Sequence, residues 1–277
     1  MNKNKNFAGF TLIELLVVIV IVGILATISV STFSGYIERA RLAKAQHFAK
    51  SSQDTLFLQA LRNGINNFTF RITYDGDSID KSGTNVYIRD LSGQENDFEP
   101  FTGSNGQDAN PSTDIPLPLG SGYSLDLNDS VRGFIKTATN TTNKPIQRGT
   151  FSTWFKYDKI NDNAQYNIIF YVYQSGNNTV SLRTNKNGEF IFRTEQDGGH
   201  EIRSEPSLIR EGLWHHVLAA YDEDKAKMKL WIDGNFIGEE IAHAGHLWGA
   251  GTMVLGGTNF KGKLDNSDFY PVVFEEF

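Results

Sequence analysis

Apolar residues are concentrated in one run near the N-terminus of this chain. Residues 10–33 read FTLIELLVVIVIVGILATISVSTF, and Glu14 is the only formally charged residue among them. A helix of this length measures about 36 Å, whereas the hydrocarbon core of a bilayer is about 30 Å thick. The pattern therefore predicts a transmembrane helix over residues 10–33.

The residues before this run, MNKNKNFAG, contain Lys3 and Lys5 and no acid. Two cations in front of an apolar span favour a cytoplasmic location for that end of the chain. A cleaved secretory signal peptide is one alternative, but no small-x-small cleavage site precedes a polar segment here. A simple membrane anchor is a second alternative, and it explains the length of the run but not the carboxylate near its start.

The helical pattern continues beyond the apolar run. Residues spaced as on one face of a helix form an apolar stripe, namely Leu42, Ala45, Ala49, Leu56 and Ala60. Asn63-Gly64 is a typical signal for the end of a helix. We expect one helix over residues 10–64, apolar first and amphipathic afterwards. Its stripe can pack against the rest of the chain or against other copies, and the sequence leaves both open.

From about residue 65 the apolar residues alternate with polar ones, as in half-buried strands. The clearest runs lie at 150–155, 167–173, 180–184, 189–194, 214–221, 228–232 and 252–256. Asn187-Gly188 and Asp233-Gly234 lie between such runs and predict tight hairpins. Many short strands with frequent turns predict an antiparallel β-sandwich over residues 65–277. The expected fold class is therefore α+β, a long helix followed by a sandwich.

Amino-acid composition and charge exclude several kinds of site and partner. The chain has no cysteine, which excludes disulfides, thiolate metal sites and a cysteine nucleophile. The net charge is −6, which divides into +2 for residues 1–9, +2 for residues 10–64 and −10 for residues 65–277. An acidic domain is not attracted to phosphate backbones, so we expect no nucleic-acid partner.

The segment Gly9-Phe10-Thr11-Leu12-Ile13-Glu14, followed by an unbroken aliphatic helix, resembles the processing site of type IV prepilins and type II secretion pseudopilins. The resemblance implies a leader peptide over residues 1–9 and a membrane peptidase that cleaves after Gly9 and methylates the amine of Phe10. It also implies a precursor in the inner membrane and a homo-oligomeric filament at the cell surface. Many members have a proline where this chain has Ser31, so we expect a straighter helix here.

Glu14 is expected to act in assembly. A carboxylate in hydrocarbon is costly unless it is paired, and the amine of Phe10, in the same or a neighbouring subunit, is the expected partner. Burial of that pair would define the axial register of the subunits. The alternative is that Glu14 merely extends to the lipid headgroups.

The C-terminal part resembles a second family, the concanavalin A-like jelly rolls of laminin-G type. The resembling segments are Arg89–Asp97, Tyr123–Leu127, Phe151–Tyr157, Gly212–Val217, Lys229–Gly234 and Phe260–Tyr270. The resemblance implies a jelly-roll domain over residues 65–277 and makes a glycan its expected ligand. The Glu-x-Asp-x-x-Glu arrangement of related glycosidases is absent from the sequence, as are other catalytic motifs. We therefore predict no catalytic residues and no enzyme activity.

The family often holds calcium near residues that correspond to Asp90, Asn96 and Asp265. Oxygen donors in turns suit calcium, but Asp and Asn in turns also bond their own backbone, and both interpretations remain open.

Trp248, beside His243 and His246 in a glycine-rich segment, is the best candidate for an aromatic plate that binds a glycan. A packed loop aromatic is the alternative. Trp154, Trp214 and Trp231 lie in framework strands and are expected in the core. His215 and His216 are expected to point to opposite faces of one strand, so they cannot hold one metal together.

Two functional hypotheses remain. The first is a structural subunit of a type IV pilus-like surface filament, with a lectin-like head for adhesion or surface recognition. The alternative is a pseudopilin of a type II secretion-like system, in which the jelly roll is a spacer or contacts cargo. An anchored surface hydrolase would need a catalytic pair that the sequence does not contain.

Overall fold

The structure is a computed structural model, and it describes residues 10–63, 70–75, 79–80, 87–100, 109–116, 122–127, 134–137, 148–160, 166–173, 180–194, 199–222, 224–241, 252–257 and 259–275. Within these residues a single helix, α1, extends over Leu12–Asn63, and every later element is a strand. Contacts divide the chain into two compact units, Met1–Arg41 and Leu42–Phe277. The second half of α1 therefore belongs to the same unit as the strands.

The described strands form two large sheets. The first contains β15 (Asn235–Ile241), β14 (Lys227–Ile232), β13 (Trp214–Asp222), β8 (Arg148–Tyr157), β17 (Gly262–Tyr270), β6 (Ser124–Leu127) and β5 (Ala109–Ser112) in that order, and β1 (Phe70–Ile72) also pairs with β17. The second contains β12 (His200–Arg203), β11 (Phe190–Thr194), β10 (Val180–Thr184), β9 (Asn167–Tyr173), β16 (Thr252–Leu255), β7 (Phe134–Thr137) and β4 (Glu99–Pro100). A separate pair is formed by β2 (Ile79–Asp80) and β3 (Tyr87–Ile88).

Neighbouring strands in both sheets are antiparallel. Apolar side chains from the two facing surfaces, among them Phe151, Phe155, Phe170 and Leu182, form one buried core between the sheets. Phe151 and Phe170 stack across it with ring centroids 4.1 Å apart. The predicted fold class, a helical N-terminal region followed by an antiparallel sandwich, is confirmed.

The two predicted hairpins differ in form. Asp233 and Gly234 have φ angles of 51° and 70° and form the two-residue turn between β14 and β15, as in a type I′ turn. Asn187-Gly188 lies in a longer connection, where the amide of Gly188 donates to the carbonyl of Asn185 and only the glycine has a positive φ. The Asn187-Gly188 pair therefore predicted the position of this turn correctly but not its length.

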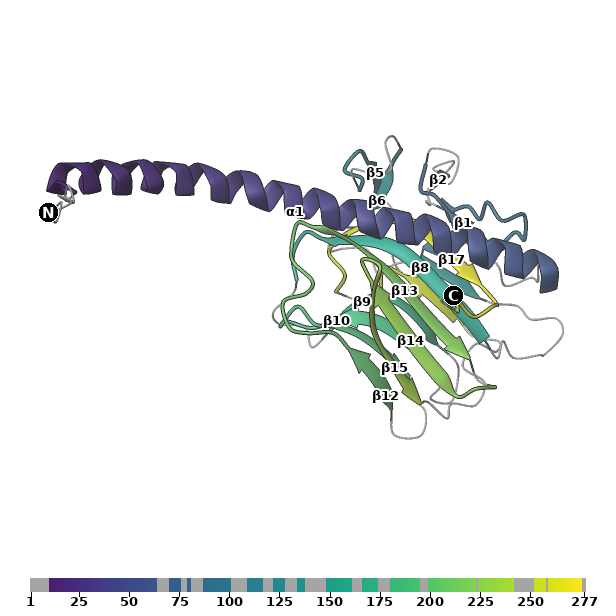
Figure 1. The fold of residues 1–277 in the computed structure, drawn as a ribbon. Coiled ribbons are helices and arrows are strands. Elements are labelled where there is room, and N and C mark those ends of the chain that lie inside the picture. The colour runs from purple at the N-terminus through teal and green to yellow at the C-terminus, as the bar shows by residue number, and fades with distance from the viewer. Residues whose placement is uncertain are drawn as a thin grey trace, which may run out of the picture. The chain divides into compact units, whose positions relative to one another are not determined.

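The second half of α1 packs against the outer face of the first sheet (Figure 1). Leu42, Ala45 and Ala49 form a buried cluster with Trp154 and Trp214. A second buried cluster contains Leu56, Ala60, Leu218, Ala220, Trp231, Tyr270, Val272 and Phe274. The predicted stripe is thus entirely buried against the chain's own sandwich, which resolves the alternative that the sequence left open. The three framework tryptophans are buried in this same layer.

Phe48 fills the space between the helix and the sheet. Its ring centroid lies 6.1 Å from that of His216, 6.4 Å from that of Trp231 and 5.7 Å from that of Phe274. A Cβ atom added to Gly234 would lie 2.9 Å from the Cβ of Phe48. The β14–β15 hairpin therefore approaches the helix so closely that a glycine is required at this position.

The helix also covers polar groups of the sheet. His216 Nε2 lies 2.9 Å from the hydroxyl of Ser152, and burial lowers the pKa of His216 to about 4. The amide of Gln53 on the helix donates to the carboxylate of Asp268 on β17. Within the described chain, His216 Nδ1, Trp231 Nε1 and one oxygen of Asp268 are buried without a hydrogen-bond partner. Polar atoms of this kind reduce stability, so the contact is held mainly by its apolar clusters.

Asp268 makes the stability of this unit depend on pH. Burial raises its pKa to about 7 from a usual 3.8, partly offset by Arg71 and Gln53. Between these two values the unfolded chain has lost the proton that the folded chain keeps, so this residue lowers stability as pH rises. Each pKa unit corresponds to about 1.4 kcal/mol.

We therefore expect Asp268→Asn to raise the melting temperature at pH 8, by a gain of about 4 kcal/mol from roughly three pKa units, and to leave it nearly unchanged at pH 4. Circular dichroism melts between these pH values measure the effect, with Asp224→Asn as a control at an exposed ion pair. A variant whose stability followed pH as the unsubstituted chain does would contradict this assignment.

The first half of α1 exposes its apolar side chains. Leu12, Ile13, and each residue from Leu15 to Val22 are exposed, as are Ile24 and Leu25. Over the part of the chain that the structure describes, no helix combines the length and the hydropathy required of a membrane span. Membrane insertion of residues 10–33 stays a prediction.

Candidate functional site

The first turn of α1 contains the predicted assembly residue. The backbone amide and the hydroxyl of Thr11 donate to the carboxylate of Glu14, at 2.9 Å and 2.8 Å, and the hydroxyl of Thr11 accepts from the amide of Glu14 at 3.3 Å. This is a capping box, in which Thr11 and Glu14 satisfy the free amides at the start of the helix. The Thr-x-x-Glu spacing signals it in the sequence, but our sequence analysis did not identify it.

The structure says little about the two predicted processing residues, Gly9 and Phe10. Phe10 precedes the helix and is exposed. Gly9 lies outside the described residues, so the predicted cleavage bond stays a prediction.

The carboxylate of Asp90 is occupied by donors of its own turn and of β1. One oxygen accepts from the amides of Arg71 and Ser92, at 2.9 Å and 2.8 Å. The other accepts from the hydroxyl of Ser92 at 2.7 Å and from the amide of Asn96 at 3.1 Å. A carboxylate offers about four acceptor positions, and these four bonds use them. The geometry thus fits the turn-forming interpretation of Asp90 better than that of a calcium ligand.

Of the remaining calcium candidates, Asn96 lies beside Asp90, since its backbone amide donates to that carboxylate, whereas the described contacts of Asp265 are with other groups. Asp265 lies on β17, where its carboxylate accepts from the side chain of Asn266 at 3.0 Å, and burial together with the nearby Asp75 raises its pKa to about 8. Asp268, not Asp265, is the β17 acid whose pKa is affected by Asp90. Among the described side chains, no three acids or histidines converge as metal ligands. Calcium binding stays a prediction.

We expect Asp90→Ala to destabilise the chain by about 2 kcal/mol, because four donors lose their acceptor. Thermal melts with excess calcium and with a chelator distinguish the two interpretations. The same loss in both conditions supports the turn. A calcium-dependent rise in melting temperature that Asp90→Ala abolishes would instead assign this residue to a calcium site.

The two adjacent histidines point to opposite faces, as predicted. His215 lies beside Phe155 of the core, and its Nδ1 is 2.8 Å from the carboxylate of Asp233. His216 faces the helix, beside Trp154. The glycan candidates Trp248, His243 and His246 lie outside the described residues, and their role stays a prediction.

The outer face of the second sheet carries a polar network that our sequence analysis missed. Alternate residues of β10, β11 and β12 point away from the core and place Arg183, Arg193 and Arg203 on this face. We call this surface the arginine face. It also includes Ser181, Glu189, Glu201 and Tyr171.

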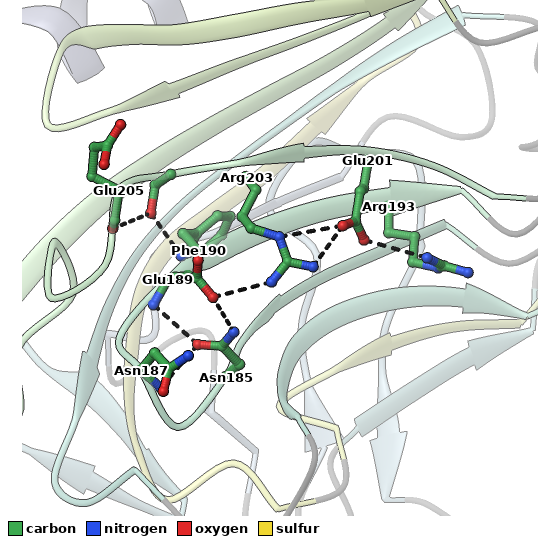
Figure 2. A network of polar contacts seen from close by, with 9 residues as sticks. Asn185, Asn187, Glu189, Phe190, Arg193, Glu201, Arg203 and Glu205 are labelled. Atoms are coloured by element: carbon green, nitrogen blue, oxygen red, sulfur yellow. Dashed lines mark hydrogen bonds and ion pairs between the residues drawn. The ribbon is translucent and has the colours of Figure 1, made fainter.

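Figure 2 shows how the charges of this face are linked. Glu201 accepts from Arg203 at 2.6 Å and from Arg193 at 3.3 Å. Arg203 also donates to Glu189 at 3.0 Å, and Glu189 accepts from Asn185. The guanidinium groups of Arg193 and Arg203 thus share the carboxylates of Glu201 and Glu189.

These contacts keep both acids ionised. Burial would raise the pKa of Glu201, but the hydrogen bonds and charges of Arg203 and Arg193 outweigh it and lower the pKa. The hydrogen bond from Asn185, assisted by Arg203, lowers the pKa of Glu189. The network is therefore charged at neutral pH, with two arginines balanced by two glutamates.

Beneath these charges the arginine face has an apolar and aromatic floor. Ile191 and Val254 are buried although they lie outside the core cluster, and Val254 pairs with Tyr171 in the neighbouring strand. The guanidinium of Arg183 stacks on the ring of Tyr166, 3.7 Å from its centroid.

Comparison with protein families gives two matches. Residues 4–30 match the prokaryotic N-terminal methylation motif. Residues 129–276 match the concanavalin A-like lectin/glucanases superfamily. The suspected fusion of a prepilin-type segment with a jelly-roll domain is confirmed.

Solved structures share the fold at low identity. Domain 4 of AbnA, a GH43 extracellular arabinanase from Geobacillus stearothermophilus, in complex with arabinotriose, is 17% identical with a TM-score of 0.55, over 75% of this chain and 93% of that one. The binding domain of botulinum neurotoxin serotype D is 16% identical with a TM-score of 0.56, over 77% of this chain and 50% of that one. Together with the match over residues 129–276, this establishes that the chain belongs to the concanavalin A-like lectin/glucanases superfamily and carries a prokaryotic N-terminal methylation motif at its start.

Proposed function

We propose that the chain is a structural subunit of a type IV pilus-like surface filament, with a lectin-like head that serves adhesion or surface recognition. The observation that carries this proposal is the contrast between the two halves of α1. The second half buries its apolar stripe against the chain's own sandwich. The first half exposes aliphatic side chains around a single acid, Glu14.

An exposed apolar helix of this kind needs a partner, because its burial is strongly favourable. Lipid would supply it before assembly, and the helices of other subunits would supply it afterwards. A change from a lipid environment to a helix-packed one is consistent with the matched methylation motif. We accordingly propose a leader over residues 1–9, a membrane-held and then polymerising helix over 10–64, and a surface-exposed head over 65–277.

The processing partner follows from the same motif. A prepilin peptidase would cleave after Gly9 and methylate the amine of Phe10. The precursor would reside in the inner membrane and the mature subunit in an extracellular filament. Glu14 would exchange its bonds to Thr11 for the amine of an adjacent subunit as the filament forms.

The head is proposed to bind rather than to catalyse. It belongs to a superfamily that includes lectins, and one structure with the same fold holds arabinotriose. Its arginine face lies on the sheet opposite to the one that packs against the helix. In a filament held by its helices, that face would be directed outwards.

A pseudopilin of a type II secretion-like system is the second candidate, because the methylation motif is common to both classes. Electron microscopy of expressing cells, with antibody labelling of the head, separates the two. Labelled filaments outside the cell are expected for the first function. Labelled protein that remains in the cell envelope, with no external filaments, would favour the second.

A further inference from the structure

We infer that a cleft at the C-terminal end of α1 binds a ligand with both an ammonium group and a carboxylate, as free amino acids and unblocked short peptides have. Asp222 holds the ammonium group and Arg62 holds the carboxylate. This inference goes beyond the proposed filament and adhesion role, because it concerns a part of the head to which the sequence motifs and the family matches give no role.

The cleft lies within the compact unit Leu42–Phe277 and has a volume of about 360 Å³. Its walls are the last turn of α1, the start of β8, the turn between β13 and β14, and the residues that follow β17. The charged residues that line it are Arg62, Arg148, Asp222, Asp224, Lys225 and Glu275. Ligand pockets in proteins start at about 300 Å³, so this cleft is large enough for a small ligand.

Two ion pairs on the rim of the cleft leave it open to solvent. Arg148 donates to the carboxylate of Asp224 at 2.6 Å, and the ammonium group of Lys225 pairs with Glu275. All four side chains are about half exposed, so a ligand reaches the cleft directly from solution. The two pairs neutralise each other's charges and leave one acid and one base of the lining, Asp222 and Arg62.

Asp222 provides a buried acceptor inside the cleft. The residue is 5% exposed, at the end of β13. One of its carboxylate oxygens accepts from the backbone amide of Lys225 at 3.3 Å. The other has no hydrogen bond among the described residues, since Nζ of Lys225 lies 3.8 Å away, beyond hydrogen-bond distance. A buried carboxylate oxygen is costly without a donor, and an ammonium group of a ligand supplies one.

Arg62 provides the complementary donor. It is exposed in the last turn of α1 and pairs with no other residue that the structure describes. A cation at the end of a helix is also favoured by the helix dipole, but that interaction uses none of the five guanidinium donors. The planar guanidinium matches a carboxylate in a bidentate manner. Arg62 and Asp222 line the same cleft and form no ion pair with each other, so each lacks a partner of opposite charge.

The balance of charges defines the class of ligand. The lining has three positive and three negative side chains, so the cleft as a whole attracts neither simple anions nor simple cations. A ligand with an ammonium group alone would leave Arg62 without a partner, and one with a carboxylate alone would leave Asp222 without one. A zwitterion satisfies both. Val272 and Val273 add an apolar part of the lining for the ligand's aliphatic groups.

Ligand-observed NMR titrations of the full chain, purified in detergent, test the inference. The probes are tri-alanine with free termini, its N-acetyl form, its C-terminal amide, and the form with both ends blocked. We expect free tri-alanine to bind about 10-fold or more tightly than either singly blocked form, because a charged hydrogen bond contributes about this factor. This preference should weaken with salt. The affinity of free alanine relative to tri-alanine identifies the source of the zwitterion, an amino acid or a peptide.

Two substitutions assign the two ends of the ligand. Arg62→Gln is expected to abolish the preference for a free carboxylate and to keep the preference for a free amine, and Asp222→Asn is expected to do the reverse. A merely structural effect would not separate the two preferences. Arg62→Lys should restore part of the first. Arg39→Gln is the matched control, because Arg39 is an exposed arginine of the same helix outside the cleft. Melting curves establish that each variant is folded.

Equal affinities for free and blocked peptides would overturn the inference, as would the absence of binding by every probe with free ends. The same loss in Arg39→Gln as in Arg62→Gln would overturn it too. Filaments are counted in these variants by electron microscopy. Normal filaments without zwitterion binding would reject the cleft alone, whereas absence of filaments from the unsubstituted chain would reject the proposed function and not the cleft.

Discussion

A chain in which Glu14 is replaced by glutamine is expected to form at least about 100-fold fewer surface filaments than the unsubstituted chain. Breaking a buried ion pair by removing one partner costs about 3–5 kcal/mol, which corresponds to this factor. Glutamine can still close the capping box with Thr11, because Glu and Gln both serve at this position. The substitution therefore removes the charge of the side chain while it leaves the start of the helix intact.

Two further variants complete this test. Thr11→Ala breaks the capping box but keeps the acid, so we expect a loss of only about 1 kcal/mol in helix stability and continued assembly. Glu38→Gln changes an acid of the same helix that lies beyond the apolar run and pairs with Arg41. Quantitative electron microscopy measures all three. If Glu14→Gln assembled normally while Thr11→Ala did not, the role of Glu14 would be capping rather than pairing.

Leu56→Asp is expected to destabilise the head by at least about 4 kcal/mol, because it buries an unpaired carboxylate between the helix and the sheet. Leu56 is fully buried with Ala60, Leu218 and Trp231. The second half of α1 is thus a structural layer of the sandwich and not merely a connection to it. Thermal melts and limited proteolysis of the full chain in detergent measure the loss.

Leu58→Asp provides the control for this substitution. Leu58 lies two residues further along the same helix and is 58% exposed. The same chemical change there should alter stability by no more than about 0.5 kcal/mol. Similar melting temperatures for the two variants would mean that the helix does not pack on the sheet as described.

Much of the fold was predictable because its signals are local. The spacing of Leu42, Ala45, Ala49, Leu56 and Ala60 identified the buried side of the helix, since burial follows helical periodicity. It missed Ser52, which is buried on the same side and bonds the carbonyl of Ala49 at 2.9 Å. A serine is polar and therefore does not count in an apolar pattern. Its burial is tolerated because its hydroxyl donates a hydrogen bond to a backbone carbonyl.

Alternation likewise located most of the long strands, whereas the strands without it were missed. The strand β15 has Gly238 and two glutamates in its sequence, and β5 contains Pro111. Both are edge strands of the first sheet, where such residues are tolerated because one side of the strand is unpaired. The positions of β15 and β5 in the sheet become evident only when segments that are distant in the sequence pair with each other.

The candidate sites were harder to predict than the fold. Arg183, Arg193 and Arg203 occupy polar positions of ordinary alternating strands, and nothing local distinguishes them from solvated residues. They share one face only because three antiparallel strands in register bring them together. Asp90 showed the opposite difficulty, because its sequence motif was evident but only its hydrogen bonds favour a turn over a metal ligand.

The central claim is that the N-terminal helix, trimmed after Gly9, is the polymerising part of the chain. Mass spectrometry of the N-terminal peptide from purified surface appendages tests it most directly. We predict filaments composed of this chain whose first residue is a methylated Phe10. Recovery of the protein only as single copies in the membrane, with residues 1–9 still attached, would contradict the account.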